Sequence, residues 1–316
     1  MKQVCIQGLG FVGVAMAIAL SNVKTAKGKP MYFVTGIDLP TEQGLKRIDA
    51  VNQGKLPFNT ADQKMATAFF AAMKTGNLVA TTDESAYTSA DFVIVDVPLD
   101  VALVDGEIQL DLSGFGNAIR TVASNIKSGA LILVETTVPP GTCEKIVWPI
   151  ICEELKKRNV DKGLVYLAHS FERVMPGIGY YDSLVNYWRV YAGRTNCAAD
   201  ICEEFLSTLI NVDQYPLKRL ASMTASEATK VLENSYRAVN IAFIDEWTKY
   251  SELIGIDLYE IVDAVRVRPT HSNIRSPGLG VGGYCLTKDP LFALASLGGL
   301  FNIDGPEFVF SKMAIE

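Results

Sequence analysis

The chain has 316 residues, of which 49% are hydrophobic and 20% are charged, and its formal net charge is −6. This length exceeds what one hydrophobic core usually supports, so we expect a globular protein of two domains. The negative charge argues against a nucleic-acid partner, and because no window reaches 18 uninterrupted apolar residues, we also expect no membrane span.

The first predicted element is a strand, turn and helix that carry a glycine motif. The motif follows the apolar run 4–6, precedes the helix-competent run 14–20, and consists of Gly8, Leu9, Gly10, Phe11, Val12 and Gly13. A G-x-G-x-x-G motif at a strand-to-helix junction indicates a dinucleotide-binding turn. The next apolar run, 31–37, ends in Asp38, whose carboxylate suits the adenosine ribose hydroxyls and repels a 2′-phosphate. We therefore expect this region to bind NAD rather than NADP.

Short apolar runs alternate with helix-like segments as far as residue 168. The predicted strands are 3–7, 31–37, 92–97, 130–134 and 164–168, and the predicted helices include 60–74, 113–126 and 143–158. This alternation is typical of an α/β fold with a parallel sheet covered on both faces. Residues at the carboxyl ends of such strands face a ligand, which makes Val97, Pro98, Thr136 and Thr137 candidates for cofactor binding. Residues 190–192 are expected to add an edge strand.

A single long helix is predicted for residues 221–253, which contain no proline or glycine. Apolar side chains recur there at intervals of three or four residues, and the helix is longer than most. Such a helix bridges units or supports a dimer contact, so we expect a homodimer through it. The predicted fold is a Rossmann-type doubly wound parallel sheet in domain 1–195, followed by a helical central domain, 196–316.

A second glycine-rich segment, 278–290, leads into Cys285 and continues to Lys288. A thiol reacts as the thiolate, and a neighbouring cation lowers the pKa of the thiol. Glycines such as Gly280 and Gly282 let a ligand approach the backbone closely. We interpret Cys285 as a nucleophile. A buried cysteine beside a turn is the alternative interpretation for an isolated cysteine.

The remaining cysteines and the histidines give weaker indications. The six cysteines include no C-x-x-C pair, and a chain with a large core does not need disulfides, so we expect a reducing compartment, the cytoplasm. His169 and His271 each lack a second ligand at metal spacing, so we expect no metal site.

Five motifs, in order along the chain, resemble those of the UDP-glucose/GDP-mannose dehydrogenase family of nucleotide-sugar 6-dehydrogenases. Residues 8–13 are similar to its NAD loop, 135–142 to its E-S-T-V-P-P-G-T segment, and 170–177 to its glutamate loop. Lys230 and Asn234, which share a helix face, resemble its central helix, and 278–290 resembles its cysteine loop, G-x-G-x-G-G-x-C-L-x-K-D.

The resemblance implies a four-electron oxidation of a nucleotide-sugar C6 alcohol with two molecules of NAD. Cys285 would form a thiohemiacetal that is oxidised to a thioester, and Lys230 and Asn234 would stabilise the oxyanions. Water and protons would be handled by Thr137, Glu172 and Asp289. The implied substrate-binding residues are Glu172, Arg173, Lys230, Asn234, Gly280 and Gly282, and Lys288 joins Thr136 and Thr137 among the cofactor-binding residues.

The expected substrate is a UDP-sugar. The string Glu172-Arg173-Val174-x-Pro176-Gly177 is closer to the N-acetylhexosamine-acting branch of the family than to the UDP-glucose branch. Within the UDP-sugars this favours a UDP-N-acetylhexosamine.

The chain departs from the family pattern in three places. Leu99-Asp100 stands where the family has T-P, which removes a hydroxyl from the nicotinamide side, and Phe171 replaces the usual proline before the glutamate. Only 31 residues follow Cys285, where the family continues into a nucleotide-sugar-binding domain, so we expect that C-terminal domain to be absent. One alternative is a β-hydroxyacid-type two-electron NAD dehydrogenase, which needs neither Cys285 nor Glu172. Another is a catalytically incomplete NAD-binding module.

Overall fold

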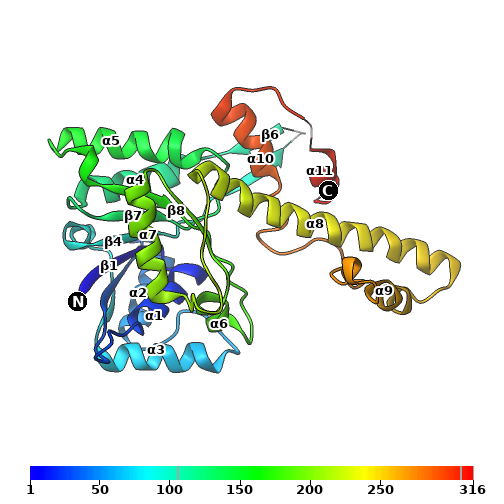
Figure 1. Cartoon of the computed structure of the whole chain (residues 1–316), viewed down its shortest axis with the longest axis horizontal. Helices are drawn as coiled ribbons and strands as arrows, with labels where there is room; N and C mark the ends of the chain where they lie inside the picture. Colours follow the sequence, from blue (N-terminus) through cyan, green and yellow to red (C-terminus); the bar gives the residue numbers. More distant parts are fainter. Residues whose placement is uncertain (105–106, 307, 316) are drawn as a thin grey trace. The chain divides into compact units, whose positions relative to one another are not determined.

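The computed structural model describes residues 1–104, 107–306 and 308–315 (Figure 1). The chain divides into two compact units. The sheet unit comprises Met1–Leu99, Leu112–Thr137 and Gly141–Glu227, and the helical unit comprises Asp100–Asp111, Val138–Pro140 and Ala228–Glu316. The domain boundary that we expect after residue 195 differs from this division and stays a prediction.

The sheet unit is built on one eight-stranded sheet with strands in the order β10-β9-β8-β7-β4-β1-β2-β3. Pairing is parallel except between β8 and β9. In chain order the strands are β1 (Lys2–Gln7), β2 (Tyr32–Ile37), β3 (Leu78–Thr81), β4 (Phe92–Val95), β7 (Leu131–Val134), β8 (Tyr166–His169), β9 (Val190–Gly193) and β10 (Lys218–Arg219). The expected doubly wound sheet is confirmed. The strand predicted at 190–192 is confirmed as β9, but the prediction that it lies at the edge of the sheet is wrong, because β10 pairs with its outer side.

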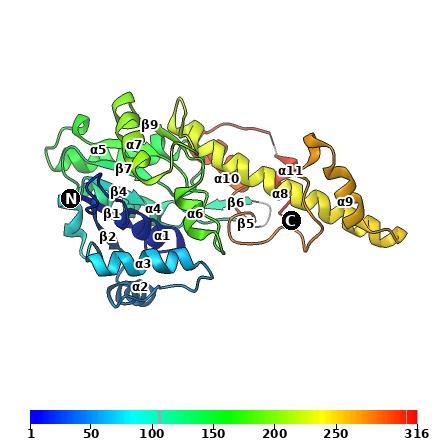
Figure 2. The same cartoon turned by 60° about the horizontal axis from the view of Figure 1, so that its bottom comes forward.

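The centre of the sheet is fully apolar. Strands β4 and β7 have the sequences FVIV and LILV, and every residue in them is buried. Continuous apolar strands of this kind are stable only where both faces are covered. Figures 1 and 2 show α4 and α5 on one face of the sheet and α1 and α3 on the other. The α-helices of this unit are α1 (Phe11–Ser21), α2 (Glu42–Asn52), α3 (Gln63–Thr75), α4 (Ser113–Asn125), α5 (Trp148–Lys157), α6 (Tyr180–Val185) and α7 (Asn196–Leu209).

The strand order fixes where a ligand binds on this sheet. Strand β1 lies between β2 and β4, and from β1 the chain builds one half of the sheet before it builds the other. This is a topological switch point, and ligands of open α/β sheets bind there, outside the carboxyl ends of the strands. The glycine motif follows β1 directly, so the predicted dinucleotide turn occupies this position.

The helical unit contains most of α8 (Met223–Ile254), whose first turn belongs to the sheet unit. The long helix predicted for 221–253 is therefore confirmed. The other elements are α9 (Leu258–Arg266), α10 (Leu291–Ser296), α11 (Val309–Met313) and the antiparallel pair β5 (Val101–Val104) and β6 (Glu107–Leu110). Ile244 of α8 packs with Leu258 and Val262 of α9. In the part of the chain that the structure describes, no helix has the length and apolar character to cross a bilayer.

Candidate active site

The dinucleotide turn is tightly packed on one side and open on the other. Gly8 has a φ of +96°, and a Cβ on it would lie 2.5 Å from the backbone oxygen of Asp96. A Cβ on Gly13 would lie 1.9 Å from the Gly8 oxygen, whereas one on Gly10 would meet no described atom within 4 Å. Glycine is therefore required at positions 8 and 13, and open space remains beside Gly10 at the N-terminus of α1, where a pyrophosphate binds.

Asp38 lies at the carboxyl end of β2 and is held by neighbours on both sides. Its carboxylate accepts hydrogen bonds from the backbone N–H of Leu9 (3.3 Å) and of Leu39 (2.8 Å). It also pairs with the Arg47 guanidinium of α2 at 3.1 Å. Sequence reasoning missed Arg47, because an arginine on an amphipathic helix gives no signal of its partner. The structure thus places the predicted ribose-binding acid directly beside the glycine turn.

An aromatic group covers the glycine turn. The Tyr180 hydroxyl of α6 donates to the backbone oxygen of Phe11 at 2.6 Å. The Phe58 ring lies between the two, with ring centroids 5.4 Å from Phe11 and 5.6 Å from Tyr180. Sequence reasoning included Phe11 and missed both partners, which are distant along the chain.

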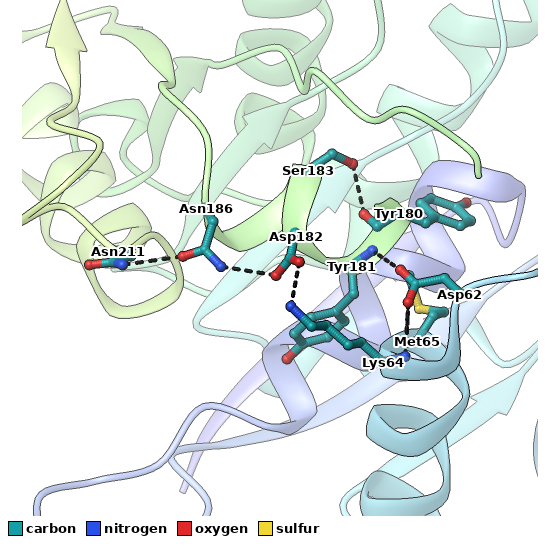
Figure 3. Close-up of polar contacts among 9 residues, drawn as sticks. All are labelled: Asp62, Lys64, Met65, Tyr180, Tyr181, Asp182, Ser183, Asn186 and Asn211. Atoms are coloured by element: carbon teal, nitrogen blue, oxygen red, sulfur yellow. Dashed lines mark hydrogen bonds and ion pairs between the residues drawn. The ribbon is translucent and has the colours of Figure 1, made fainter. Parts of the chain in front are cut away.

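Polar contacts fix helix α6 to the start of α3 (Figure 3). Because Tyr180 is the first residue of α6, these contacts also position its side chain. The buried Asp62 caps α3 by accepting from the backbone N–H of Lys64 (2.8 Å), and its other oxygen accepts from the N–H of Tyr181 (2.7 Å). The Lys64 ammonium pairs with Asp182 at 2.5 Å. The Asp62 carboxylate therefore caps the start of α3 and also holds the first turn of α6.

Thr136 closes the carboxyl ends of the central strands. Its hydroxyl lies 3.1 Å from the backbone oxygen of Val95, the last residue of β4, and 2.8 Å from that of Val97, so its one proton is donated to either carbonyl or shared between them. Thr137 is half-buried, and Pro98 is exposed. The predicted cofactor residues after β4 and β7 are thus brought together at one edge of the sheet.

Buried charges lie at the same edge. Glu135, which is 1% exposed, forms an ion pair with Arg189, which is 3% exposed. Burial raises the pKa of Glu135, while Arg189 opposes that rise. Burial also raises the pKa of Asp96, and the neighbouring Glu135 and Glu172 carboxylates raise it further. Sequence reasoning missed Asp96 and Arg189.

The glutamate loop follows β8. Glu172 is half-buried and accepts a hydrogen bond from the backbone N–H of Val174. Arg173 donates to the backbone oxygen of Trp188 at 2.5 Å, and its guanidinium lies 5.0 Å from the centroid of the Phe171 ring. Phe171, which replaces the family's proline, is completely buried, so its ring anchors the loop beneath Glu172 and Arg173.

A glutamate on α8 holds the turn that precedes α5. The buried Glu227 accepts from the backbone N–H of Gly141 (2.6 Å) and of Cys143 (2.8 Å). Burial raises the pKa of Glu227 to about 7, and the two backbone hydrogen bonds oppose that rise. Sequence reasoning missed this residue, because its partners lie more than eighty positions earlier in the chain.

The cysteine loop belongs to the helical unit. Cys285 is exposed, and its backbone oxygen accepts from the N–H of Lys288 (3.2 Å) and of Asp289 (2.9 Å). Gly280 and Gly283 have φ angles of +80° and +85°, which other residues adopt only with strain. The glycines therefore shape a loop in which Cys285 is an exposed residue.

Asp289 is the buried centre of this loop. It accepts from the side-chain amide of Asn234 at 2.7 Å and pairs with the Lys288 ammonium at 3.0 Å. Lys230, half-buried, lies one helical turn before Asn234 on α8. The structure thus joins two predicted catalytic residues, Asn234 and Asp289. Lys288, predicted to bind the cofactor, contacts Asp289.

Asp100 gives a physical reason for one departure from the family pattern. Its carboxylate accepts a hydrogen bond from the Tyr284 hydroxyl, next to the nucleophile candidate Cys285. Burial and the Asp100 carboxylate raise the pKa of Tyr284. The acid that replaces a proline therefore holds the residue adjacent to Cys285.

Comparison with known proteins agrees with these motifs. Residues 2–210 match the NAD binding domain of the UDP-glucose/GDP-mannose dehydrogenase family, and residues 224–301 match its central domain. The chain belongs to this family. NAD is therefore the cofactor of the sheet unit.

Individual relatives from this family act on amino sugars. UDP-N-acetyl-D-mannosamine dehydrogenase of Methanocaldococcus jannaschii is 34% identical over 92% of this chain and 61% of its own length. The solved UDP-D-ManNAc dehydrogenase of Pyrococcus horikoshii has a TM-score of 0.81 at 26% identity, covering 99% of this chain and 68% of that one. An NDP-N-acetyl-D-galactosaminuronic acid dehydrogenase of Methanosarcina mazei has a TM-score of 0.79 at 26% identity, over 99% and 66%. The chain thus spans about 61% of the length of the curated relative.

The residues present fit NAD. The open space beside Gly10 suits the pyrophosphate, the Asp38 carboxylate suits the adenosine ribose hydroxyls, and the chain after β4 and β7 lies across the switch point from Asp38. These features together leave room for a dinucleotide along the carboxyl edge of the sheet.

Proposed function

We propose that this chain belongs to an NAD-dependent nucleotide-sugar 6-dehydrogenase that oxidises a C6 alcohol to a carboxylate. The alcohol loses four electrons and takes its second carboxylate oxygen from water. When bound, NAD supplies the hydride acceptor in both oxidations. Support comes from the two matched regions and from the names of the relatives.

Cys285 is the nucleophile in this proposal. Its sulfur adds to the C6 aldehyde to give a thiohemiacetal, and loss of hydride converts that adduct into a thioester. Water then attacks the thioester carbon, and the thiolate leaves. The observation that carries this assignment is the exposed thiol in a glycine-shaped loop that also carries Asp289, itself bonded to Asn234.

The other proposed roles follow from the chemistry of each side chain. Lys230 and Asn234 donate hydrogen bonds to oxyanions on the substrate. Glu172 and Asp289 accept protons, and Thr137 positions water or the substrate hydroxyl. Arg173, Gly280 and Gly282 are proposed to contact the substrate, and Lys288 the cofactor. A UDP-N-acetylhexosamine is the proposed substrate, since the relatives named above act on N-acetylated amino sugars.

The deciding experiment counts NADH formed per sugar consumed with a panel of UDP- and GDP-sugars. We expect two NADH per sugar, loss of turnover in Cys285→Ser, and unchanged NAD binding in that variant. Cys197→Ser, which changes another exposed cysteine, is the matched control. One NADH per sugar with full activity in Cys285→Ser would favour a β-hydroxyacid-type dehydrogenase. NAD binding without turnover on any sugar would favour an incomplete NAD-binding module.

A trapped intermediate tests the role of Glu172. If this carboxylate activates the hydrolytic water, Glu172→Gln should accumulate a thioester on Cys285, visible as an added sugar-nucleotide mass in intact-protein mass spectrometry. The absence of any adduct in a variant that still makes both NADH would contradict the assignment.

We also propose a homodimer through α8. Large apolar side chains on this helix remain exposed, and they include Leu232, Tyr236, Phe243, Trp247, Tyr250 and Leu253. An exposed apolar stripe of this extent is typical of a protein interface.

The cytoplasm is the proposed location. None of the six cysteines forms a disulfide in the structure, which suits a reducing compartment.

A further inference from the structure

Two carboxyl groups, those of Asp96 and Glu135, directly follow the two central strands of the sheet, and each has an oxygen without a hydrogen-bond partner among the described residues. Strands β4 and β7 pair with Val95 opposite Val134, so Asp96 and Glu135 follow at the same level on neighbouring strands. Glu135 is 1% exposed, and one of its oxygens pairs with Arg189. Its Oε2 and the Oδ2 of Asp96 are both inaccessible to solvent and have no hydrogen-bond partner among the described residues. A buried oxygen of this kind needs a proton or a ligand nearby.

The charges around these groups do not balance. Asp96 and Glu135 are two carboxyls beside one guanidinium, that of Arg189, which pairs with Glu135, and the negative charge of Glu172 acts on both carboxyls as well. The other titratable groups facing the cluster are Tyr180 of α6 and Cys202 of α7. A tyrosine and a cysteine are neutral when protonated and negative when ionised; burial raises the pKa of both, so both stay neutral and neither offsets a carboxylate charge. Burying an uncompensated carboxylate is costly, and a carboxyl in that position keeps its proton.

The cluster also lies next to the cofactor turn. The backbone oxygen of Asp96 is the atom that a Cβ on Gly8 would strike at 2.5 Å. Asp38, which suits the adenosine ribose, ends β2 on the other side of β1. The nicotinamide half of NAD therefore belongs at the ends of β4 and β7. The nicotinamide ring is positively charged in NAD⁺ and neutral in NADH.

We propose that Asp96 and Glu135 hold one proton between them, release it to solvent when NAD⁺ binds, and keep it when NADH binds. The bond broken is a carboxyl O–H, and no other covalent bond changes. A positive charge brought close to a carboxyl stabilises its ionised form, which is the cause of the release. By linkage, the affinity for NAD⁺ rises with pH, by at most about tenfold per pH unit, while the affinity for NADH does not. This inference rests on the NAD cofactor and not on the proposed sugar oxidation.

Calorimetry on the full chain measures the released proton. Binding of NAD⁺ and of NADH is titrated in two buffers that differ in ionisation enthalpy, and the difference in heat gives the number of protons released. We expect about one proton per NAD⁺ and close to none per NADH. Asp96→Asn has nearly the same shape but no titrating carboxyl, so it should release almost none with NAD⁺.

A matched control lies on the same strand. Asp91→Asn makes the same chemical change at the opposite end of β4, where Asp91 pairs with Lys127 and accepts from the backbone of Gln3. It should release the same number of protons as the unmodified chain. Circular dichroism confirms that each variant folds. Infrared spectroscopy of the free protein at neutral pH should show a protonated-carboxyl band that Asp96→Asn removes or shifts.

Three outcomes would overturn the proposal. These are an absence of buffer dependence with NAD⁺, an equal release with NADH, or full release from a folded Asp96→Asn. A missing protonated-carboxyl band in the unmodified chain would do so as well. Failure to oxidise any nucleotide sugar would count against the proposed function. It would not affect this proposal, because proton release is measured on NAD⁺ binding alone.

Discussion

We propose that Asp38 makes this chain prefer NAD over NADP. The Asp38 carboxylate would lie where NADP carries a 2′-phosphate. The same carboxylate forms an ion pair with the Arg47 guanidinium, so Arg47 is not available to bind a phosphate. In Asp38→Ala the repulsion disappears and Arg47 is released to bind phosphate, so the ratio of NAD to NADP affinity should fall about tenfold or more. Calorimetric titration with both cofactors measures this ratio. Asp49→Ala, on the same helix as Arg47, should leave it unchanged.

Glu227 should make stability depend on pH in an unusual direction. Its pKa is about 7 in the folded chain against 4.5 for an ordinary glutamate. The folded state therefore binds more protons than the unfolded state between these values, so the free energy of unfolding falls as pH rises. The loss over this window is at most about 3 to 4 kcal/mol, from a pKa difference of about 2.5.

Urea unfolding at several pH values between about 5 and 7 measures this slope. Glu227→Gln cannot titrate and should flatten the slope. Glu246→Gln, on an exposed position of the same helix, serves as the control. An unchanged slope in Glu227→Gln would show that other groups cause the pH dependence.

Sequence patterns located site residues that carry a local signal. Gly8, Gly10 and Gly13 are spaced for a turn, and Asp38 follows an apolar strand, so each was found from its immediate neighbours. Arg47 and Glu227 act through contacts that the fold creates, and nothing beside them in the sequence marks those contacts.

The β1–α1 turn is the element with the least tolerance for added atoms. In Gly13→Ala the new Cβ would lie 1.9 Å from the Gly8 oxygen, so strand and helix must separate. We expect a loss of about 1–3 kcal/mol in unfolding free energy and at least about tenfold weaker NAD binding. Thermal unfolding and calorimetry measure the two effects. Gly114→Ala on α4, where a Cβ meets no described atom within 4 Å, should change neither.

The junction of α3 and α6 should depend on Asp62 far more than on Lys64 (Figure 3). Asp62→Ala removes a helix cap and leaves the backbone N–H of Tyr181 without its acceptor, at a cost of about 1–3 kcal/mol. Lys64→Ala removes a solvent-exposed ion pair, which contributes little to stability, so its loss should be clearly smaller than that of Asp62→Ala. Chemical unfolding of the two variants gives both values, and equal losses would contradict this account.

Elements with strong periodicity or long apolar runs were predicted, and weaker ones were not. The sequence of β4 and the uninterrupted pattern of α8 indicate their structures directly. Strand β3, LVAT, has an apolar run of only three residues, and α2 has few apolar positions, so both were missed. The pairing of β8 with β9 is antiparallel. Local sequence patterns do not predict this, because the relative direction of two strands depends on the segment that connects them.

At the scale of the whole molecule, we expect α8 to determine the oligomeric state. If its exposed side chains form the proposed dimer interface, Trp247→Glu should place a charge in that interface and shift the protein to monomer. Sedimentation at micromolar concentration should show a dimer of the 34.4 kDa chain and a monomer for the variant. Lys249→Ala, two positions away, removes only an exposed ion pair with Asp245 and should leave the dimer intact. A monomeric unmodified chain would refute the proposal.

The strand order also determines how the sheet can form while the chain is being synthesised. Strand β1 leaves the ribosome first, and every later strand adds outside a strand already present: β2 and β3 on one side, and β4, β7, β8, β9 and β10 on the other. No strand has to enter between two that are already paired. Until β7 arrives, however, the apolar β4 is an unprotected edge, and edges of this kind pair readily with other chains. A pause in translation after β4 has emerged and before β7 has emerged would therefore leave this apolar edge open to aggregation.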